Sequence, residues 1–464
     1  MASFIEGFAA AGDMQRDALA RETGEALFPA LLFRADVQRT QFEGTIGESK
    51  TVPVPGLLEI NTSPRTIGVT PTPDQQDFEY YRIKPEPYGR TVAQSLPANY
   101  ASAVGPYFQK KKAQVLQAAQ TINRVLRNKL YAPYLGGHSI VDSVAGAGLA
   151  ITVNSLNGFS SSVDPTSGYP VPVSSVSPRS FQRNGVTVVG SAIVAATPND
   201  PLNPLGPGVL TLDVAAGFVA GDRIDALDAS LIIRPGTATN VDGIGIGDLF
   251  NGDLVQRAVT VLRDNSVPTH ADGTYHVHFP TSGERGLLRD NLVQRQIETR
   301  GLEDDPFAKF AFGRGLSCTF FSNNQCPDLA TIDASKRTSS RPATAPNAIN
   351  AGDIGADVVN KDGVNVMRAI VTGGGVIQEH YVDEMSYMTE AGYLGRVEAR
   401  MVDNRGIEVR ADGIRFVDQA PTDLYGETTM MGWSMTADWA PPTNRLSGKG
   451  PAAYKLGCII ECAA

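Results

Sequence analysis

Two histidines, His276 and His278, stand two positions apart in the stretch DGTYHVHFP, which runs from Asp272 to Pro280. In a β-strand this spacing places both imidazoles on the same face of a sheet. Imidazole is a common metal ligand, and a carboxylate, Glu284, follows a few residues later. The spacing therefore allows two interpretations: the first ligands of a metal site, or two half-polar side chains packed on one side of a sheet.

The metal interpretation lacks ligands, because a mononuclear site normally takes three or more protein side chains. Glu284 lies near the position of the glutamate in cupins, but it also closes TSGE, a capping-box pattern that predicts the start of a helix. The remaining histidines stand in no recognisable ligand arrangement: His138, His270 and His380. We therefore predict no metal site and no cofactor, and regard the histidines as sheet-face residues.

Other candidate motifs also lack parts. GWSMT around Ser434 resembles a nucleophile elbow, but its fifth position is a threonine and no histidine follows it in the chain. DGIGIGDLF has neither the spacing of a dinucleotide loop nor the lysine of a phosphate loop. The triple glycine at 373–375 favours a turn or hinge, and the triple lysine at 110–112 favours a solvated helix face or a partner contact. We predict no catalytic residue.

Composition limits the class of protein. There are 40 Lys and Arg against 49 Asp and Glu, a formal net charge of −9, which argues against a general nucleic-acid binder. The 30 prolines and 47 glycines indicate many turns and extended connections. The four cysteines fit buried thiols better than a disulfide framework or a zinc site: Cys318, Cys326, Cys458 and Cys462. No secretion signal or long apolar run is evident, so we expect a soluble protein made in a cytoplasm.

The residue pattern in the first third of the chain predicts an arm, an extended ribbon and a long helix. Prolines recur every few residues between 46 and 96, which disfavours central strands and favours a projecting two-stranded loop. The stretch YFQKKKAQVLQAAQTINRVLRNKLY, at 107–131, then carries one apolar face at helical spacing: Phe108, Val115, Ala119, Ile122, Leu126 and Leu130.

A β-rich insertion follows the helix. No lysine occurs between Lys129 and Lys309, and no glutamate between Glu86 and Glu284, although exposed helices favour both residues. Short β-forming segments separated by proline and glycine predict a small barrel or sandwich over 138–245. After it, Leu254, Ala258 and Leu262 mark a second helix, and the last hundred residues are mainly β-forming, with a loop predicted over 330–362.

Three motifs carry a resemblance to a known family. LRDNSVPTHADGTYHVHFP is similar to the helix, turn and strand of podophage-type coat proteins, and FAFGRGLSCTFFSNNQ resembles the segment that follows there. TNRLSGKGPAAYKLGCIIE resembles the closing strand of the same family. The order of parts is also similar to that of the major capsid proteins of tailed bacteriophages and herpesviruses, the Hong Kong ninety-seven type. The resemblance covers most of the chain outside 138–245.

The resemblance implies an α+β fold with a peripheral domain built on a long spine helix, an axial domain, an extended loop and an N-terminal arm. We add an inserted β-rich subdomain and predict six parts: arm 1–45, extended loop 46–96, spine helix 97–137, insertion 138–245, a helix–strand–helix part of the peripheral and axial domains 246–330, and the axial domain with return strands 331–464. In that family the arm and loop reach over neighbouring subunits.

The implied function is the major capsid protein of a tailed double-stranded DNA phage, present in the virion and assembled in the cytoplasm of a host bacterium. Its expected partners are copies of itself in hexamers and pentamers, with scaffolding protein, portal and a decoration protein as further candidates. It would enclose DNA without sequence-specific binding and without a membrane. The alternatives are another virion or surface β-protein (tail, fibre or adhesin) and, less favoured, a cupin-like metal-dependent enzyme using His276, His278 and Glu284.

Overall fold

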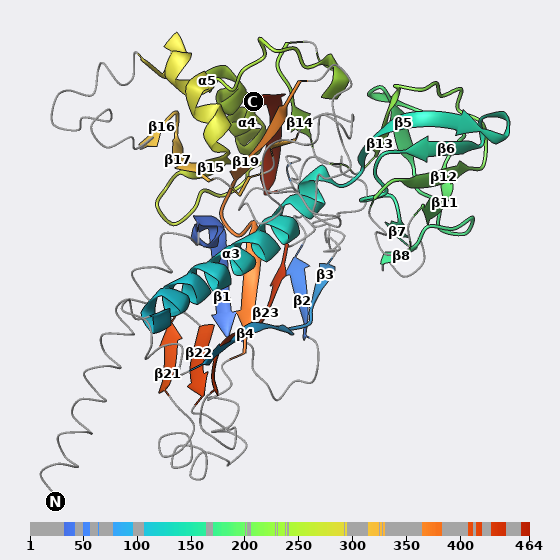
Figure 1. Ribbon diagram of the computed structural model, residues 1–464. Helices are drawn as coiled ribbons and strands as arrows, with labels where there is room; N and C mark the ends of the chain where they lie inside the picture. Colours follow the sequence, from blue (N-terminus) through green and yellow to red (C-terminus); the bar gives the residue numbers. More distant parts are fainter. Residues whose placement is uncertain are drawn as a thin grey trace, which may run out of the picture. The chain divides into compact units, whose positions relative to one another are not determined.

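A computed structural model describes residues 32–41, 50–55, 64, 78–95, 106–163, 170–199, 201, 206–227, 229, 231–236, 238, 241–291, 293–294, 314–323, 325–326, 328–329, 364–382, 407–411, 414–419, 428–441 and 456–464. Few helices and several sheets make up the described chain, which confirms the predicted α+β class (Figure 1). No helix of the described residues is long and apolar enough to cross a membrane.

The chain divides into two compact units. The first comprises Met1–Val52, Tyr80–Leu126 and Ile377–Ala440, and the second comprises Pro53–Glu79, Arg127–Val376 and Pro441–Ala464. The six parts expected from the sequence are a finer division and stay a prediction, and the loop expected at 330–362 lies outside the described residues.

The sheet of the first unit is built around β23 (Thr428–Ala440), where alternate residues are buried as the period of a strand requires. Its strand order is β1 (Val37–Gln41), β20 (Ile377–Tyr381), β23, β22 (Ile414–Gln419) and β21 (Ile407–Ala411), and β4 (Glu86–Ser95) pairs with β23 over ten residues. The short 3-10 helix η2 (Leu32–Asp36) precedes β1. Separately, β2 (Lys50–Pro55) and β3 (Phe78–Ile83) form a two-stranded sheet.

Helix α3 (Pro106–Leu135) is longer than the predicted 107–131 and includes Pro133. The predicted apolar face is confirmed where burial is described, since Val115, Ala119, Ile122, Leu126 and Leu130 are at most 1% exposed. Gln114, a polar residue outside that apolar face, is also buried, with 2% of its surface exposed. The helical spacing therefore predicts the packed face of α3 correctly, but the buried surface of the helix is wider than the predicted apolar face.

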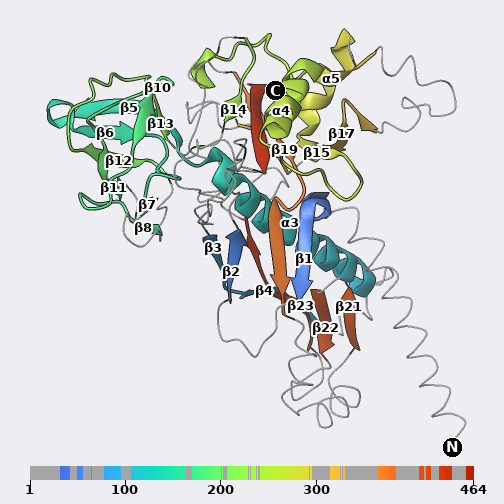
Figure 2. The ribbon, with the colours of Figure 1, turned by 180° about the vertical axis from the view of Figure 1, so that it is seen from behind.

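The second unit holds a mixed sheet with strand order β14 (Ile232–Ile233), β24 (Gly457–Ala463), β19 (Val366–Thr372), β15 (Tyr275–Phe279), β17 (Cys318–Ser322) and β16 (Arg314–Gly315); β18 (Asp328–Leu329) pairs with β19. Helix α4 (Gly252–Asp264) packs against it and begins at Asn251, whose side chain accepts a hydrogen bond from the backbone amide of Leu254 at 3.0 Å. Leu254, Ala258 and Leu262 share its buried face, as predicted. Figure 2 shows α4 beside β24 and β19.

The insertion forms a second seven-stranded sheet with its own apolar core. Its order is β10 (Val186–Thr187), β9 (Phe181–Arg183), β13 (Arg223–Ala226), β5 (His138–Ala145), β6 (Ala150–Val153), β12 (Gly208–Leu212) and β11 (Ile193–Pro198). A bridge between Arg179 and Ile193 joins β11 to the segment leading into β9, so the sheet closes into a small barrel. A β-hairpin, β7 (Ser161–Val163) with β8 (Pro170–Pro172), and a 3-10 turn, η4 (Gly146–Gly148), lie within the same insertion.

Candidate functional site

His276 and His278 lie on β15, where every residue is buried. His276 stacks on His270 with ring centroids 3.9 Å apart, and its Nε2 lies 3.3 Å from Asp272 Oδ2. His278 stacks on Phe321 at 4.9 Å. Among the described residues of the second unit, His276 therefore has an imidazole and a carboxylate beside it, whereas the stacked neighbour of His278 is a phenylalanine ring. The expectation of no metal site stays a prediction.

Glu284 is not a cap. It begins α5 (Glu284–Arg289) directly after η6 (Thr281–Gly283), and neither helix start has a side-chain cap hydrogen bond. The predicted capping box is therefore wrong. The Glu284 carboxylate instead accepts a hydrogen bond from the Ser322 hydroxyl at the end of β17. A tertiary partner brought close by the parallel β15–β17 pairing has replaced the local one.

The remaining sequence candidates lie in ordinary structural positions. Ser434 is in the middle of β23, opposite Gly89 and Arg415, where the strand continues without the sharp turn of a nucleophile elbow. The Gly243–Gly247 stretch follows η5 (Val241–Gly243), and the Gly245 amide donates to Asp248 at 2.8 Å. Gly375, between β19 and β20, has a φ of +79°, as a glycine turn would. Lys112 is exposed on α3.

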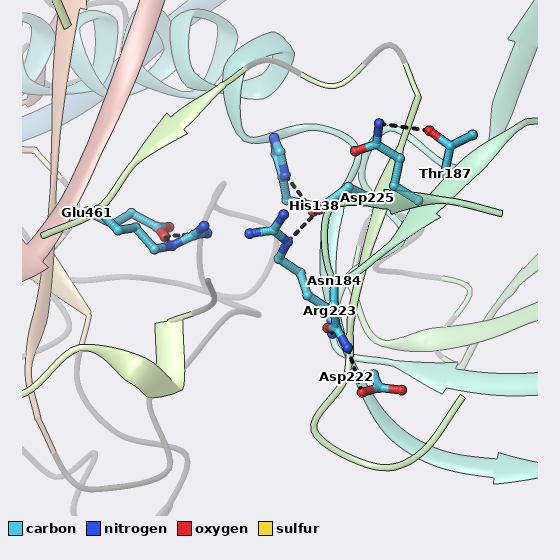
Figure 3. A network of polar contacts seen from close by, with 9 residues as sticks. His138, Asn184, Thr187, Asp222, Arg223, Asp225 and Glu461 are labelled. Carbon is cyan, nitrogen blue, oxygen red and sulfur yellow. Dashed lines mark hydrogen bonds and ion pairs between the residues drawn. The ribbon is translucent and has the colours of Figure 1, made fainter. Parts of the chain in front are cut away.

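A buried polar network was missed by the sequence reading (Figure 3). Its centre is Glu461 on β24, a carboxylate that is 1% exposed and lies between two arginines. Arg234 donates from Nε at 2.8 Å, and Arg368 of the neighbouring strand β19 donates from Nε at 2.7 Å. Burial raises the pKa of Glu461, but the two guanidinium charges outweigh it and bring the pKa down to about 2.

A second cluster lies where the barrel begins. His138, the first residue of β5, faces Asp225 of β13, with His138 Nδ1 2.9 Å from Asp225 Oδ1, and Arg223 contacts the other oxygen. Burial alone would raise the pKa of Asp225, yet its partners His138, Arg223 and Arg234 hold that pKa below its usual range. A proton on His138 would also lower the pKa of Glu461, which links the two clusters electrostatically.

The network ties the barrel to the mixed sheet of the same unit. The apolar side chains beside it come from both parts: Ile140 of β5 packs with Val241, Ile244, Val366 and Ala463. The signal that could have found the network is a lone glutamate within the apolar strand GCIIECA, since a buried charge needs a partner. The identity of that partner is not readable from sequence, because Arg234 and Arg368 stand 227 and 93 positions away. Chemically the network can hold charge and fix geometry, and it offers no nucleophile.

Comparisons with known proteins give likeness in structure alone. No family model and no curated protein matches the sequence. The fold is similar to a chain of the capsid of Ralstonia phage GP4, with a TM-score of 0.47 and 11% identity over 92% of this chain and 87% of that chain. It is similar to a chain of the cyanophage Pam1 capsid asymmetric unit (TM-score 0.49, 10% identity, 92% and 88% covered) and to one of the bacteriophage PhiM1 mature capsid (0.43, 8%, 93% and 86%). At such low identity the likeness does not assign a function, which must come from the chain's own features.

Proposed function

We propose that this chain is the major capsid protein of a tailed double-stranded DNA bacteriophage and that its copies assemble into the icosahedral head. The observation that carries the proposal is that β4 is an edge strand with many exposed residues. β4 pairs only with β23 in the described chain, and its exposed residues are Glu86, Pro87, Gly89, Arg90, Thr91 and Ala93. A long exposed edge is a liability in a monomer, because its free N–H and C=O groups invite pairing with another chain.

The two-stranded sheet of β2 and β3 supports the same proposal. It gains no third strand from the described residues, and a lone two-stranded ribbon is marginally stable in water. Such a ribbon becomes stable when it lies across a neighbouring subunit, which is the role that the family resemblance implies for it. Similar contacts repeated around a ring close into hexamers and pentamers.

The role is structural rather than enzymatic in this proposal. Scaffolding protein, portal and a decoration protein are its further proposed partners, and assembly would take place in the host cytoplasm before the protein becomes part of the virion. The net charge of −9 suits a lining that encloses DNA without trapping it, since phosphate binding needs basic residues.

We expect the full-length chain, expressed alone or with its scaffolding protein, to form shells or ring-shaped capsomers in negative-stain micrographs. Rods or trimers in the same images would favour a tail, fibre or adhesin component. A chain that stays monomeric under all conditions, with scaffold included, would contradict the proposal.

Metal analysis tests the enzyme alternative directly. The purified protein is expected to carry no stoichiometric transition metal held by His276, His278 and Glu284, because the ring of His278 packs against Phe321 and the Glu284 carboxylate is hydrogen-bonded to Ser322. The matched variant is the double substitution His276→Ala with His278→Ala. A transition metal bound one per chain in the wild type and lost in this variant would overturn the assignment.

A further inference from the structure

A buried histidine of the first unit has no part in the network described above. His380 on β20 is 3% exposed and stands opposite Asp438 of β23 in the strand register. Neither ring nitrogen of His380 has a hydrogen-bond partner in the described structure. Leaving a buried polar group unpaired costs roughly 1–3 kcal/mol, so this position holds a polar ring where an apolar one would be more stable.

Asp438 is already engaged with the chain that leaves the ribbon. Its Oδ2 accepts a hydrogen bond from the backbone amide of Lys84 at 2.9 Å, and its Oδ1 accepts one from the amide of Trp439 at 2.9 Å. Lys84 directly follows β3, whose last residue Ile83 is fully buried. Asp438 therefore fixes the point at which the returning strand of the ribbon joins the first unit.

The start of β2, the strand that leads into the ribbon, also acts on His380 electrostatically. Lys50, the first residue of β2, places a positive charge that acts on His380. The other nearby carboxylate, Glu379, is committed elsewhere: Arg34 binds it at 2.6 Å, and the indole of Trp439 donates to it at 2.8 Å. Arg39 approaches the same carboxylate at 3.9 Å. Asp438 is thus the acceptor left for a protonated His380.

We propose that protonation of His380 opens the base of the β2–β3 ribbon. This base, which we call the root, consists of Lys50 at the start of β2 and Lys84 directly after β3. When the ring is neutral, Asp438 holds the Lys84 amide and the root is closed. When the ring gains a proton, it becomes a donor beside Asp438 and a like charge to Lys50. The imidazolium then competes with the Lys84 amide for the carboxylate and repels the start of β2, so the root opens.

The direction of the pH effect follows from burial. Desolvation and the charge of Lys50 lower the pKa of His380, against the opposing pull of Asp438 and Glu379. The closed root therefore binds the proton less well than the open root, in which the ring is solvated and can donate to an Asp438 carboxylate that has released the Lys84 amide, so that its pKa is at least the ordinary value of about 6.5. The closed form is unaffected by pH well above 6.5 and loses stability as the pH falls below it.

Hydrogen exchange of the full-length chain tests this release, and the result does not depend on whether shells form. After correction for intrinsic exchange, opening at the Lys84 amide is expected to be more frequent at pH 5.5 than at pH 7.5. The increase reaches about tenfold for an open-state ring with the ordinary pKa of about 6.5 and a closed-state ring that stays neutral, because pH 5.5 lies one unit below that open-state pKa. His380→Gln should abolish the increase. The matched control, His138→Gln, changes a histidine of the second unit and should keep it.

Asp438→Asn provides an independent check that does not depend on His380→Gln folding. The amide oxygen can still accept from the Lys84 amide, but the open root loses the carboxylate that would bind the imidazolium directly, so the increase at pH 5.5 should be smaller than in the wild type. No increase in the wild type, an equal increase in His380→Gln, or an undiminished increase in Asp438→Asn would each overturn the proposal.

Discussion

Glu461→Gln is expected to lower the free energy of unfolding of the second unit by about 3–5 kcal/mol, the cost of removing one partner from a buried ion pair. The substitution keeps the shape of the side chain, so it tests charge rather than packing. It leaves Arg234 and Arg368, whose side chains are 6% and 1% exposed, without their shared counter-charge in the apolar interior. Neither guanidinium can shed its proton to relieve the cost.

The measurement has to report on the second unit alone. Both tryptophans, Trp433 and Trp439, lie on β23 in the first unit, so their fluorescence serves as an internal reference. Hydrogen exchange of the β19 and β24 amides in increasing urea gives the stability of the mixed sheet. The β24 protection should fall strongly, and the tryptophan transition should move much less.

Asp222→Asn is the matched control, since it also neutralises an arginine's partner. Arg183 and Asp222 are 2.8 Å apart, but their side chains are 32% and 11% exposed, and partly solvated pairs contribute at most about 1 kcal/mol. Equal effects of the two substitutions would show that burial does not govern the Glu461 cluster.

The same cluster predicts an acid dependence with a definite sign. The pKa of Glu461 is about 2 in the folded chain, below its ordinary value of 4.5. Its contribution to stability is therefore complete above that ordinary value and is lost as the pH falls toward 2. Glu461→Gln should remove this part of the acid dependence, while leaving the pH dependence proposed for His380 unchanged.

Local sequence pattern was enough for the elements and their buried faces. The apolar residues of α3 recur at helical spacing, and the side chains so chosen are buried wherever the structure describes them. Ile407–Ala411 and Ile414–Gln419 are strands, as expected for the β-forming last hundred residues. These features depend on residues close together in the chain, which is why one sequence suffices to see them.

Tertiary pairing could not be obtained in the same way. TSGE has the residues of a capping box, yet the Glu284 carboxylate accepts a hydrogen bond from Ser322, 38 positions away. Glu461 reads as one polar interruption in an apolar strand until β14 and β19 place an arginine on each side of it. In both cases the partner is chosen by sheet topology, which a local pattern does not encode.

Gly158→Ala is expected to destabilise the junction between α3 and the barrel by about 2–5 kcal/mol, combining about 1–2 for the left-handed backbone with about 1–3 for overpacking. Gly158 has a φ of +80°, and a Cβ there would lie 2.2 Å from the backbone nitrogen of Gly137. The neighbouring backbone cannot yield freely, because the Gly137 amide donates to the Asn157 carbonyl at 2.7 Å and the Asn157 side chain donates to the Ala132 carbonyl at 3.2 Å.

Gly190→Ala separates the two contributions within the same barrel. Gly190 has nearly the same backbone angle, a φ of +82°, but a Cβ there would meet nothing within 4 Å. It should therefore lose only the backbone part, about 1–2 kcal/mol. Exchange protection of the β5 and β13 amides measures both variants. If the two variants lost equal stability, the close approach of the 157–158 turn to the end of α3 would not contribute to the stability of the junction between α3 and the barrel.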